Sequence, residues 1–331
     1  MRMDRATLFA LAALFGAFGT CFARGIALRR KILNQPNPIV PQHTCAVPYL
    51  GGLGIAIGIG LTALFADLNL PMRVAFPALL FLVIGTLDDL RPIPPGPKFG
   101  IQALAAAAAV AAGNRAALTG WGTADILLSA LWIIITVNAF NVTDVCDGLV
   151  GGLSVICFLF LALLIPNNST LLFAMAAASL GFLLFNFPPA RIFLGDGGSH
   201  LLGFLAASFT LTLVRNSGRW PELPQALLIC SLPLSELAFL VATRICKGIP
   251  WWKGSADHFS LRLQVSGLSR SQTDLVAWTL SALFGLQAVL LNGSPRYIQM
   301  LMLAAASGVL VCFGLVLFRF NVPVQRNGER G

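Results

Sequence analysis

The chain has 331 residues, of which 57% are hydrophobic and only 11% are charged, and its mean hydropathy is +0.81. Soluble domains carry about 25% charged residues and always leave a wide surface in water, so this composition excludes a soluble fold. The 7 cysteines are scattered, mostly within apolar runs, which argues against a disulfide framework or a zinc site.

Apolar runs long enough to cross a bilayer recur along the whole chain, and each crossing needs about 20 apolar residues. We predict an all-α, polytopic transmembrane helix bundle with about eleven spans, or ten if the Ala-rich run 100–116 is not one. Residues 1–331 then form a single integral membrane domain. The first run alone is also typical of a signal peptide, but ten similar runs follow it. The predicted spans are 6–24, 49–67, 72–87, 100–116, 123–140, 148–165, 169–186, 199–215, 224–245, 274–292 and 298–319.

Basic residues mark one side of this predicted bundle. With span ends counted in the adjoining loop, one set of alternate loops holds 15 Lys and Arg residues and the other set holds 7. The positive-inside rule makes the first set cytoplasmic. We therefore predict that the N-terminus lies outside and the C-terminus in the cytoplasm. The cytoplasmic loops expected to carry the chemistry are about 25–48, 88–99, 138–147, 187–199 and 246–273.

Six of the 13 acidic residues lie in four loops of this basic face. Acidic side chains near a bilayer are costly and tend to be kept for function. The positive-inside rule gives no reason to gather them there, whereas a shared metal and phosphate site does. The six are Asp88, Asp89, Asp144, Asp147, Asp196 and Asp257.

Asp88 and Asp89 are adjacent at the predicted end of a span, and a Pro-rich stretch leads from them to Lys98. Two neighbouring carboxylates repel unless a cation or a proton lies between them. Mg²⁺ takes oxygen ligands and keeps waters and substrate phosphates in its shell. The alternative is a solvated, helix-capping pair of acids.

Polar residues recur every three positions across 138–147, which places Asn138, Asn141 and Asp144 near one face of a helix or tight turn. Asp147 ends the series, and for this residue the alternative is a helix N-cap.

The segment 186–199 contains the turn Gly-Asp-Gly-Gly around Asp196, directly before a span. Its N–H groups and the helix N-terminus suit an anion. Arg191 is a candidate partner for phosphate, and Phe193 either stacks on a base or packs.

The longest cytoplasmic loop combines Asp257, His258 and Arg262 with the paired Trp251 and Trp252. An amphipathic helix resting on the lipid headgroups is the alternative to a substrate-binding loop. The two tryptophans favour an interfacial anchor.

In this order the motifs resemble the polyprenyl-phosphate N-acetylhexosamine-1-phosphate transferases, glycosyltransferase family 4. That family includes phospho-N-acetylmuramoyl-pentapeptide transferase and undecaprenyl-phosphate GlcNAc-1-phosphate transferases. The resemblance runs from about His43 to Ser271. It rests on V-P-x-L-G-G before the second span, Asp88-Asp89 with Lys98, N-x-x-N-x-x-D-x-x-D-G-L and P-A-R-I-F-L-G-D-x-G-S.

The resemblance implies Mg²⁺ dependence, with Asp196 as the metal ligand. We predict that Asp144 shares the ion and that Mn²⁺ can substitute for Mg²⁺. The resemblance also implies a nucleoside near Asn186 and Phe193. With the residues above, we predict catalytic roles for Asp88, Asp89, Asp144, Lys98 and His258. We predict substrate-binding roles for Asn138, Asn141, Asp147, Asn186, Arg191, Phe193, Arg262 and His43.

The chain departs from the family pattern in two places. The last loop keeps only His258, with Arg262 nearby, where the family usually has a histidine cluster such as H-x-H-H, and Val145 replaces the first glycine of D-G-x-D-G. The muramoyl-pentapeptide branch has K-x-x-T-P-T-M-G-G before the second span, whereas this chain has the segment from His43 to Gly52. These differences favour the UDP-N-acetylhexosamine branch.

The predicted function is transfer of an N-acetylhexosamine 1-phosphate from a UDP-sugar, UDP-GlcNAc or a related one, to undecaprenyl phosphate. UMP is released, and a lipid-linked cell-envelope glycan is begun in the bacterial cytoplasmic (inner) membrane. The expected partners are the UDP-sugar, the polyprenyl phosphate and membrane lipid, with no nucleic acid; a homodimer is left open. The alternatives are a transporter or flippase of polyprenyl-linked sugars and phospho-MurNAc-pentapeptide transferase activity. Transporters hold their acids at mid-membrane, where this chain has only Glu236.

Overall fold

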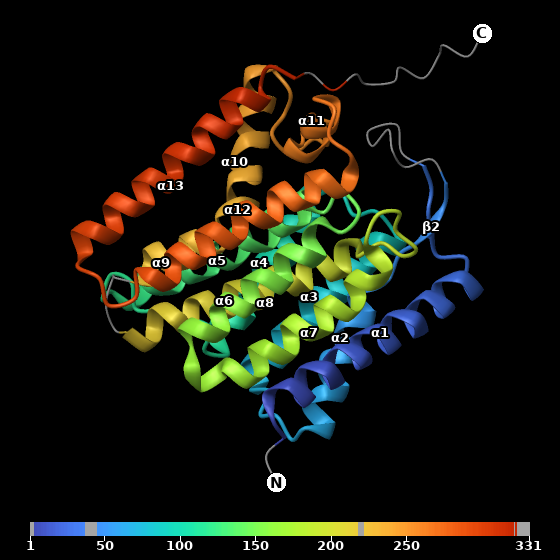
Figure 1. Ribbon diagram of the computed structural model, residues 1–331, viewed down its shortest axis with the longest axis horizontal. Helices are drawn as coiled ribbons and strands as arrows, with labels where there is room; N and C mark the ends of the chain where they lie inside the picture. Colours follow the sequence, from blue (N-terminus) through green and yellow to red (C-terminus); the bar gives the residue numbers. More distant parts are fainter. Residues whose placement is uncertain (1–2, 37–44, 218–221, 321, 323–331) are drawn as a thin grey trace.

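The computed structural model describes residues 3–36, 45–217, 222–320 and 322, and most of them lie in helices (Figure 1). Each predicted span falls on a helix, except that 224–245 falls on two. The helices are α1 (Arg5–Arg29), α2 (Gly51–Phe65), α3 (Met72–Leu90), α4 (Pro95–Ala111), α5 (Gly122–Thr143), α6 (Leu149–Leu164), α7 (Ser169–Asn186), α8 (Gly195–Ser217), α9 (Glu222–Ile229), α10 (Ser231–Cys246), α11 (Phe259–Val265), α12 (Arg270–Leu290) and α13 (Arg296–Leu317).

The long apolar helices make the chain a multi-pass membrane protein. Within the described residues, six helices are long and apolar enough to cross a membrane, and a seventh crossing arises if α9 and α10 count as one span. Helices α2 and α6 are apolar but shorter. The total of eleven spans and the orientation of the termini stay predictions.

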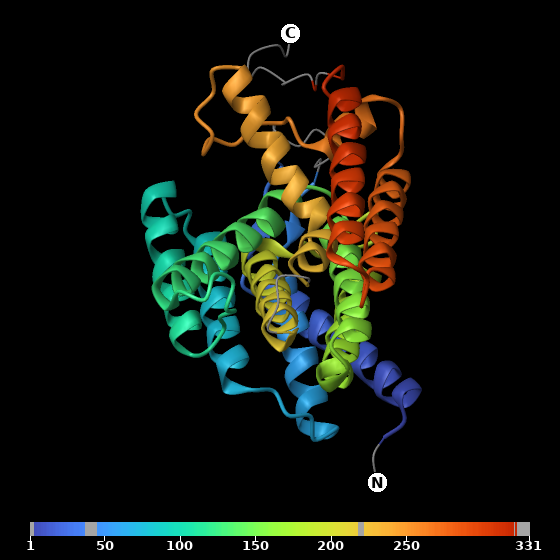
Figure 2. The ribbon, with the colours of Figure 1, turned by 90° about the vertical axis from the view of Figure 1, so that its left-hand side faces the viewer.

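The predicted span 224–245 is bent by 70° where α9 ends and α10 begins. Pro233 lies in the first turn of α10. A proline lacks the backbone N–H, and its ring clashes with the carbonyl group four residues earlier, so α9 cannot continue through this point. The bend sends α10 beyond the rest of the bundle, to the end where α11 lies and α13 ends (Figure 2).

Helix α8 forms the centre of the bundle. Its apolar stretch, which lies within Gly195–Arg215, is entirely buried. The helix packs against α2, α3, α5, α6 and α9. Glycines allow its neighbours to approach closely. A Cβ atom on Gly52 of α2 would lie 2.2 Å from Cα of Gly198, and one on Gly85 of α3 would lie 2.3 Å from the carbonyl oxygen of Asp196. The first turn of α8 is therefore clamped between α2 and α3.

Two short strands between α1 and α2 connect this part of the chain to the centre of the bundle. Strands β1 (Leu33–Asn34) and β2 (Val47–Pro48) pair antiparallel, so the all-α prediction missed a small sheet. The N–H of Phe193 donates to the carbonyl oxygen of Pro48 over 2.8 Å, and the N–H of Gly51 donates to that of Phe193 over 3.0 Å. These bonds fix the segment before α8 against the start of α2.

Several predicted loops are shorter than expected because the helices continue into them. Asp88 and Asp89 lie in the last turn of α3, and Lys98 lies in the first turn of α4. Asn138 and Asn141 lie within α5, and Asp196 lies in the first turn of α8. Most of the expected site residues are thus held by helix ends.

Candidate active site

Side chains from α3, α4 and α5 meet Asp196 at the first turn of α8. The ammonium nitrogen of Lys98 lies 2.6 Å from Oδ2 of Asp88 and 2.7 Å from Oδ2 of Asp196. Asn141 donates from Nδ2 to Oδ1 of Asp196 over 2.9 Å and to the hydroxyl oxygen of Ser199 over 3.0 Å. Both oxygens of Asp196 are therefore oriented by protein donors, and Lys98 neutralises part of the charge of two acids.

Asp89 caps the N-terminus of α8 from outside that helix. Its carboxylate accepts the N–H of Asp196 over 2.9 Å and the N–H of Gly197 over 3.1 Å. These first N–H groups have no partner within the helix and form its positive end. A Cβ atom on Gly195, where φ is +77°, would lie 2.6 Å from Oδ2 of Asp89. Asp89 thus fixes the position of Asp196.

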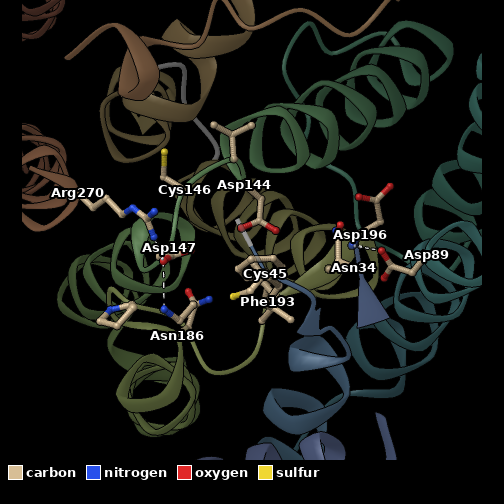
Figure 3. A pocket seen from close by; sticks show the side chains of 16 residues that line it. Asn34, Cys45, Asp89, Asp144, Cys146, Asp147, Asn186, Phe193, Asp196 and Arg270 are labelled. Atoms are coloured by element: carbon tan, nitrogen blue, oxygen red, sulfur yellow. Dashed lines mark hydrogen bonds and ion pairs between the residues drawn. The ribbon is translucent and has the colours of Figure 1, made fainter. Parts of the chain in front are cut away.

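A pocket of about 440 Å³ opens beside this cluster. Figure 3 shows Asp89 and Asp196 at one end of the pocket, Asp147 and Arg270 at the other, and Asp144 and Phe193 between them. The lining residues are Asn34, Cys45, Val47, Asp89, Asp144, Val145, Cys146, Asp147, Asn186, Pro189, Ala190, Phe193, Leu194, Gly195, Asp196 and Arg270.

Asp144 follows the last residue of α5 and has no counter-charge among the described residues. No described group donates a hydrogen bond to its carboxyl group. Loss of water around it, followed by the negative charges of Asp196, Asp89 and Asp147, raises the pKa of Asp144 well above its usual value. A cation bound in the pocket would relieve this repulsion.

The opposite end of the pocket is built by backbone groups and one ion pair. Oδ2 of Asp147 accepts the N–H of Ala190 over 3.1 Å and Nη1 of Arg270 over 3.1 Å. Asn186 accepts the N–H of Gly148 over 2.9 Å and donates to the carbonyl oxygen of Ile192 over 2.9 Å. Asn186 therefore joins the segments on either side of the pocket and determines its shape.

Comparison with known proteins identifies the family. The profile of glycosyl transferase family 4 matches residues 72–214. An undecaprenyl-phosphate alpha-N-acetylglucosaminyl 1-phosphate transferase of Thermotoga maritima is 32% identical over 234 residues, which cover 70% of this chain and 73% of that protein. The chain belongs to glycosyl transferase family 4. The family predicted from the sequence motifs is therefore confirmed.

Other family 4 members match over more of the chain at lower identity. The protein of the same name from Escherichia coli (strain K12) is 25% identical over 334 residues, 95% of this chain and 89% of that protein. A Bacillus subtilis (strain 168) relative, named as a probable undecaprenyl-phosphate N-acetylglucosaminyl 1-phosphate transferase, is 28% identical over 300 residues, 85% of this chain and 83% of that protein.

In this family 4 chain the structure does not bring His258 to the pocket. Nδ1 of His258 lies 2.8 Å from Oε1 of Glu236, and Oε2 of Glu236 accepts the N–H of Phe259 over 3.2 Å. Burial opposes ionisation of the neighbouring Asp257, but hydrogen bonds and charge from Lys247 and Arg262 outweigh it and lower the pKa of Asp257. This loop is stabilised by its own ion pairs.

Arg262 also lies away from the pocket, although we predicted a substrate-binding role for it. Its guanidinium is fully buried; it donates to Oδ1 of Asp257 over 2.7 Å and to the carbonyl oxygen of Phe320 over 2.7 Å. It also lies over the rings of Phe239 and Phe318. Arg262 thus ties α11 to α10 and to the end of α13.

We expect Arg262→Lys to destabilise the folded protein by roughly 1–3 kcal/mol, the cost of leaving buried hydrogen-bonding groups without their partner. A lysine cannot reproduce the planar fork of donors that reaches both Asp257 and Phe320. Thermal unfolding in detergent measures the loss, with Arg91→Lys at an exposed position as the matched control. An unchanged melting temperature with a raised KM for the donor would instead favour substrate binding by Arg262.

The remaining predicted residues lie behind or outside the pocket. Nδ2 of Asn138 donates to Oε1 of Gln102 over 2.9 Å, and Gln102 contacts His200 over 3.2 Å, so Asn138 belongs to a layer behind Asn141. The side chain of Arg191 is exposed and does not line the pocket. His43 lies outside the described residues.

Two residues at the site were not predicted from the sequence. Arg270 was counted only as a cytoplasmic charge, yet it lines the pocket and pairs with Asp147. Tyr49 donates from its hydroxyl group to the carbonyl oxygen of Asp89. Arg270 follows the loop that carries His258, so a basic residue in the first turn of the next span was the available signal.

The carboxylates present fit one hard divalent cation. Among the described residues, no group of three His, Cys, Asp or Glu side chains is arranged to hold a metal ion. Mg²⁺, however, is usually bound by one or two carboxylates, with waters and substrate phosphates completing its shell. Asp144 and Asp196 line the same pocket, and Asp144 lacks a protein donor. These two residues are the ones that could hold Mg²⁺.

Proposed function

We propose that this family 4 enzyme transfers N-acetylglucosamine 1-phosphate from UDP-GlcNAc to undecaprenyl phosphate and releases UMP. The observation that carries the proposal is that Asp88 and Asp196 share Lys98, while Asp89, Asp144 and Asp196 line one pocket. The names of the relatives from Thermotoga maritima and Escherichia coli support the sugar and the acceptor.

The pocket suits a donor that lies along its length. The pyrophosphate would bind at the end with Asp196, whose carboxylate lies 2.7 Å from Lys98, and the nucleoside would extend past Phe193 toward Asn186. An oxygen of the lipid phosphate attacks the β-phosphorus, and the bond from that phosphorus to the bridging oxygen of UMP breaks. When bound by Asp144 and Asp196, Mg²⁺ would supply charge stabilisation for the pyrophosphate.

Lys98 lies 2.7 Å from Asp196 and would therefore be close to the expected reacting phosphates. Its ammonium group would share the negative charge that the acceptor phosphate brings to the pyrophosphate. Asp88 holds Lys98 through Oδ2 and accepts the N–H of Ile93 through Oδ1 over 2.6 Å. A phosphate monoester has a second pKa near 6 and is mostly dianionic at pH 7, so little is needed from a base. These contacts favour Asp88 as the residue that positions Lys98.

The same proposal places the pocket at the cytoplasmic face of the bacterial inner membrane, where the transfer would begin a lipid-linked envelope glycan. The excess of Lys and Arg in the loops around the pocket supports this orientation. A cytoplasmic face would give the site access to nucleotide sugars, while the apolar helices would hold the prenyl chain of the acceptor.

Metal removal tests the proposed reaction. Purified protein with UDP-GlcNAc, undecaprenyl phosphate and Mg²⁺ is expected to release UMP. EDTA should abolish the release, excess Mg²⁺ should restore it, and Mn²⁺ should substitute in part, because the pyrophosphate and the acids repel one another without a cation. Omission of undecaprenyl phosphate is the control for hydrolysis. UMP release that persists in EDTA would contradict the metal assignment, and absence of release under every condition would contradict the function.

A further inference from the structure

Three buried side-chain oxygens lie where α9 begins, α12 ends and α13 begins, and no described group donates a hydrogen bond to them. They are Oε2 of Glu222 and Oε1 of Gln225 in α9, and Oε1 of Gln299 in α13. Gln225 is only 1% exposed and Gln299 only 2%. Burial of a carboxylate or amide oxygen without a partner costs free energy, so these atoms point to a ligand.

The amide nitrogen of each glutamine determines the direction of its oxygen. Nε2 of Gln225 donates to the carbonyl oxygen of Ala288 over 3.2 Å, and Nε2 of Gln299 donates to that of Ser294 over 2.9 Å. Turning either amide around would place two acceptor oxygens against each other. Both amide oxygens therefore face away from these carbonyl groups and remain as acceptors.

The contacts with α12 place the three oxygens at one junction of helices. Gln299 also donates to the carbonyl oxygen of Leu291 over 3.4 Å, about one helical turn beyond Ala288, to which Gln225 donates. Glu222 lies three positions before Gln225 and therefore on the same face of α9. Helix α9 packs against α12 and α13, and Figure 1 shows it beside the end of α12 and the start of α13.

We infer that Glu222, Gln225 and Gln299 bind a hard cation at this junction. Carboxylate and amide oxygens are the ligands that hard cations such as Ca²⁺ take, with water completing the shell. A single water molecule would satisfy the site less well. It has two hydrogens for three acceptors, and it leaves the charge of Glu222 without compensation.

The proposed cation site is separate from the pocket. Arg270 begins α12 at the pocket, and Ala288 lies near the other end of that helix, about 27 Å away at 1.5 Å per residue. The apolar stretch of α13 is only 11% buried, so little packing holds this helix in place. A cation shared by α9, α12 and α13 would join α13 to the bundle. The inference does not depend on the proposed transfer reaction.

Thermal unfolding in detergent tests the site. The protein is stripped with EDTA and titrated with CaCl₂ or NaCl, since both cations bind oxygen ligands, and choline chloride at the same ionic strength is the reference. At tenfold excess over Kd the melting temperature should rise by roughly 2–5 °C, because the cation binds the folded state alone. The salt that gives the rise identifies the cation. Identical melting temperatures in all three salts would overturn the inference.

Two variants locate the cation. Glu222→Gln keeps the size of the side chain and removes its charge, and Gln225→Leu removes the amide oxygen. Each is expected to raise the Kd for the cation at least roughly tenfold, the effect of losing one charged or polar ligand. A merely structural role of Glu222 would lower the melting temperature equally with and without the cation, and that result would contradict the inference.

Two controls complete the experiment. Gln287→Leu matches Gln225→Leu, because Gln287 donates from α12 to the carbonyl oxygen of Met302 in α13 over 2.8 Å, whereas its own oxygen is not one of the buried unpaired atoms. Asp196→Asn separates the junction from the pocket. Both controls should keep the full response to the cation. A response that is lost in Asp196→Asn and kept in Glu222→Gln would place the cation in the pocket and overturn the inference.

Discussion

Replacing Asp196 by asparagine is expected to lower UMP release roughly a thousandfold, which is the upper range for loss of one charge-stabilising group at a reacting centre. The substitution keeps the size and one acceptor oxygen, so the bond from Asn141 can persist. It removes the charge that Lys98 faces at 2.7 Å and one of the two carboxylates proposed for Mg²⁺. The affinity for Mg²⁺ should fall with the rate, which a titration of UMP release against Mg²⁺ measures.

Two further variants separate this effect from a general effect of removing an acid. Asp67→Asn alters an exposed acid in a turn with φ of +48°, a conformation that asparagine also adopts, and it should leave the rate unchanged. Asp89→Asn keeps one acceptor for the first N–H groups of α8 and should cost less than Asp196→Asn. Activity of Asp196→Asn within tenfold of the wild type would remove Asp196 from the metal role.

The sequence predicted that the acids share one face of the bundle, but not that they would meet. Once the positive-inside rule placed the loops with Asp88, Asp144 and Asp196 on one face, the only remaining question was whether they would meet. The structure brings Asp88 and Asp196 to the same lysine and Asp144 to the same pocket. Hydropathy also located the helices, since long apolar runs in lipid have few alternatives to a helix.

The partners of the charged groups did not follow from the sequence. Asp89 binds the N–H groups of a helix that begins more than 100 positions later, as the separation of 107 between Asp89 and Asp196 shows. Arg262 was expected at the substrate, yet its donors are taken by Asp257 and by carbonyl groups near the end of α13. A sequence gives the side of the membrane on which a charge lies. Which group that charged side chain contacts depends on how helices far apart in the sequence pack together.

Replacing Lys98 by methionine is the second change with a large expected effect. Methionine keeps the length of the side chain but leaves the carboxylates of Asp88 and Asp196 facing each other without a counter-charge. Like charges at such a distance favour protonation of one acid. Because the lysine side chain retains 17% exposure, we expect a loss of about 2–3 kcal/mol of folding stability, less than for a fully buried pair. Activity should fall at least roughly a hundredfold, since the cation facing the phosphates is absent.

A double variant separates the two roles of Lys98. Asp88→Asn added to Lys98→Met removes one of the two opposed carboxylates, so the melting temperature in detergent should return most of the way to the wild-type value. UMP release should stay low, because no ammonium group faces Asp196 and the reacting phosphates. Asp88→Asn alone should keep more activity than Lys98→Met, since the lysine remains bound to Asp196 at 2.7 Å. If the double variant instead regained both stability and activity, Lys98 would serve only to neutralise Asp88. Another cation would then stabilise the charge of the reacting phosphates.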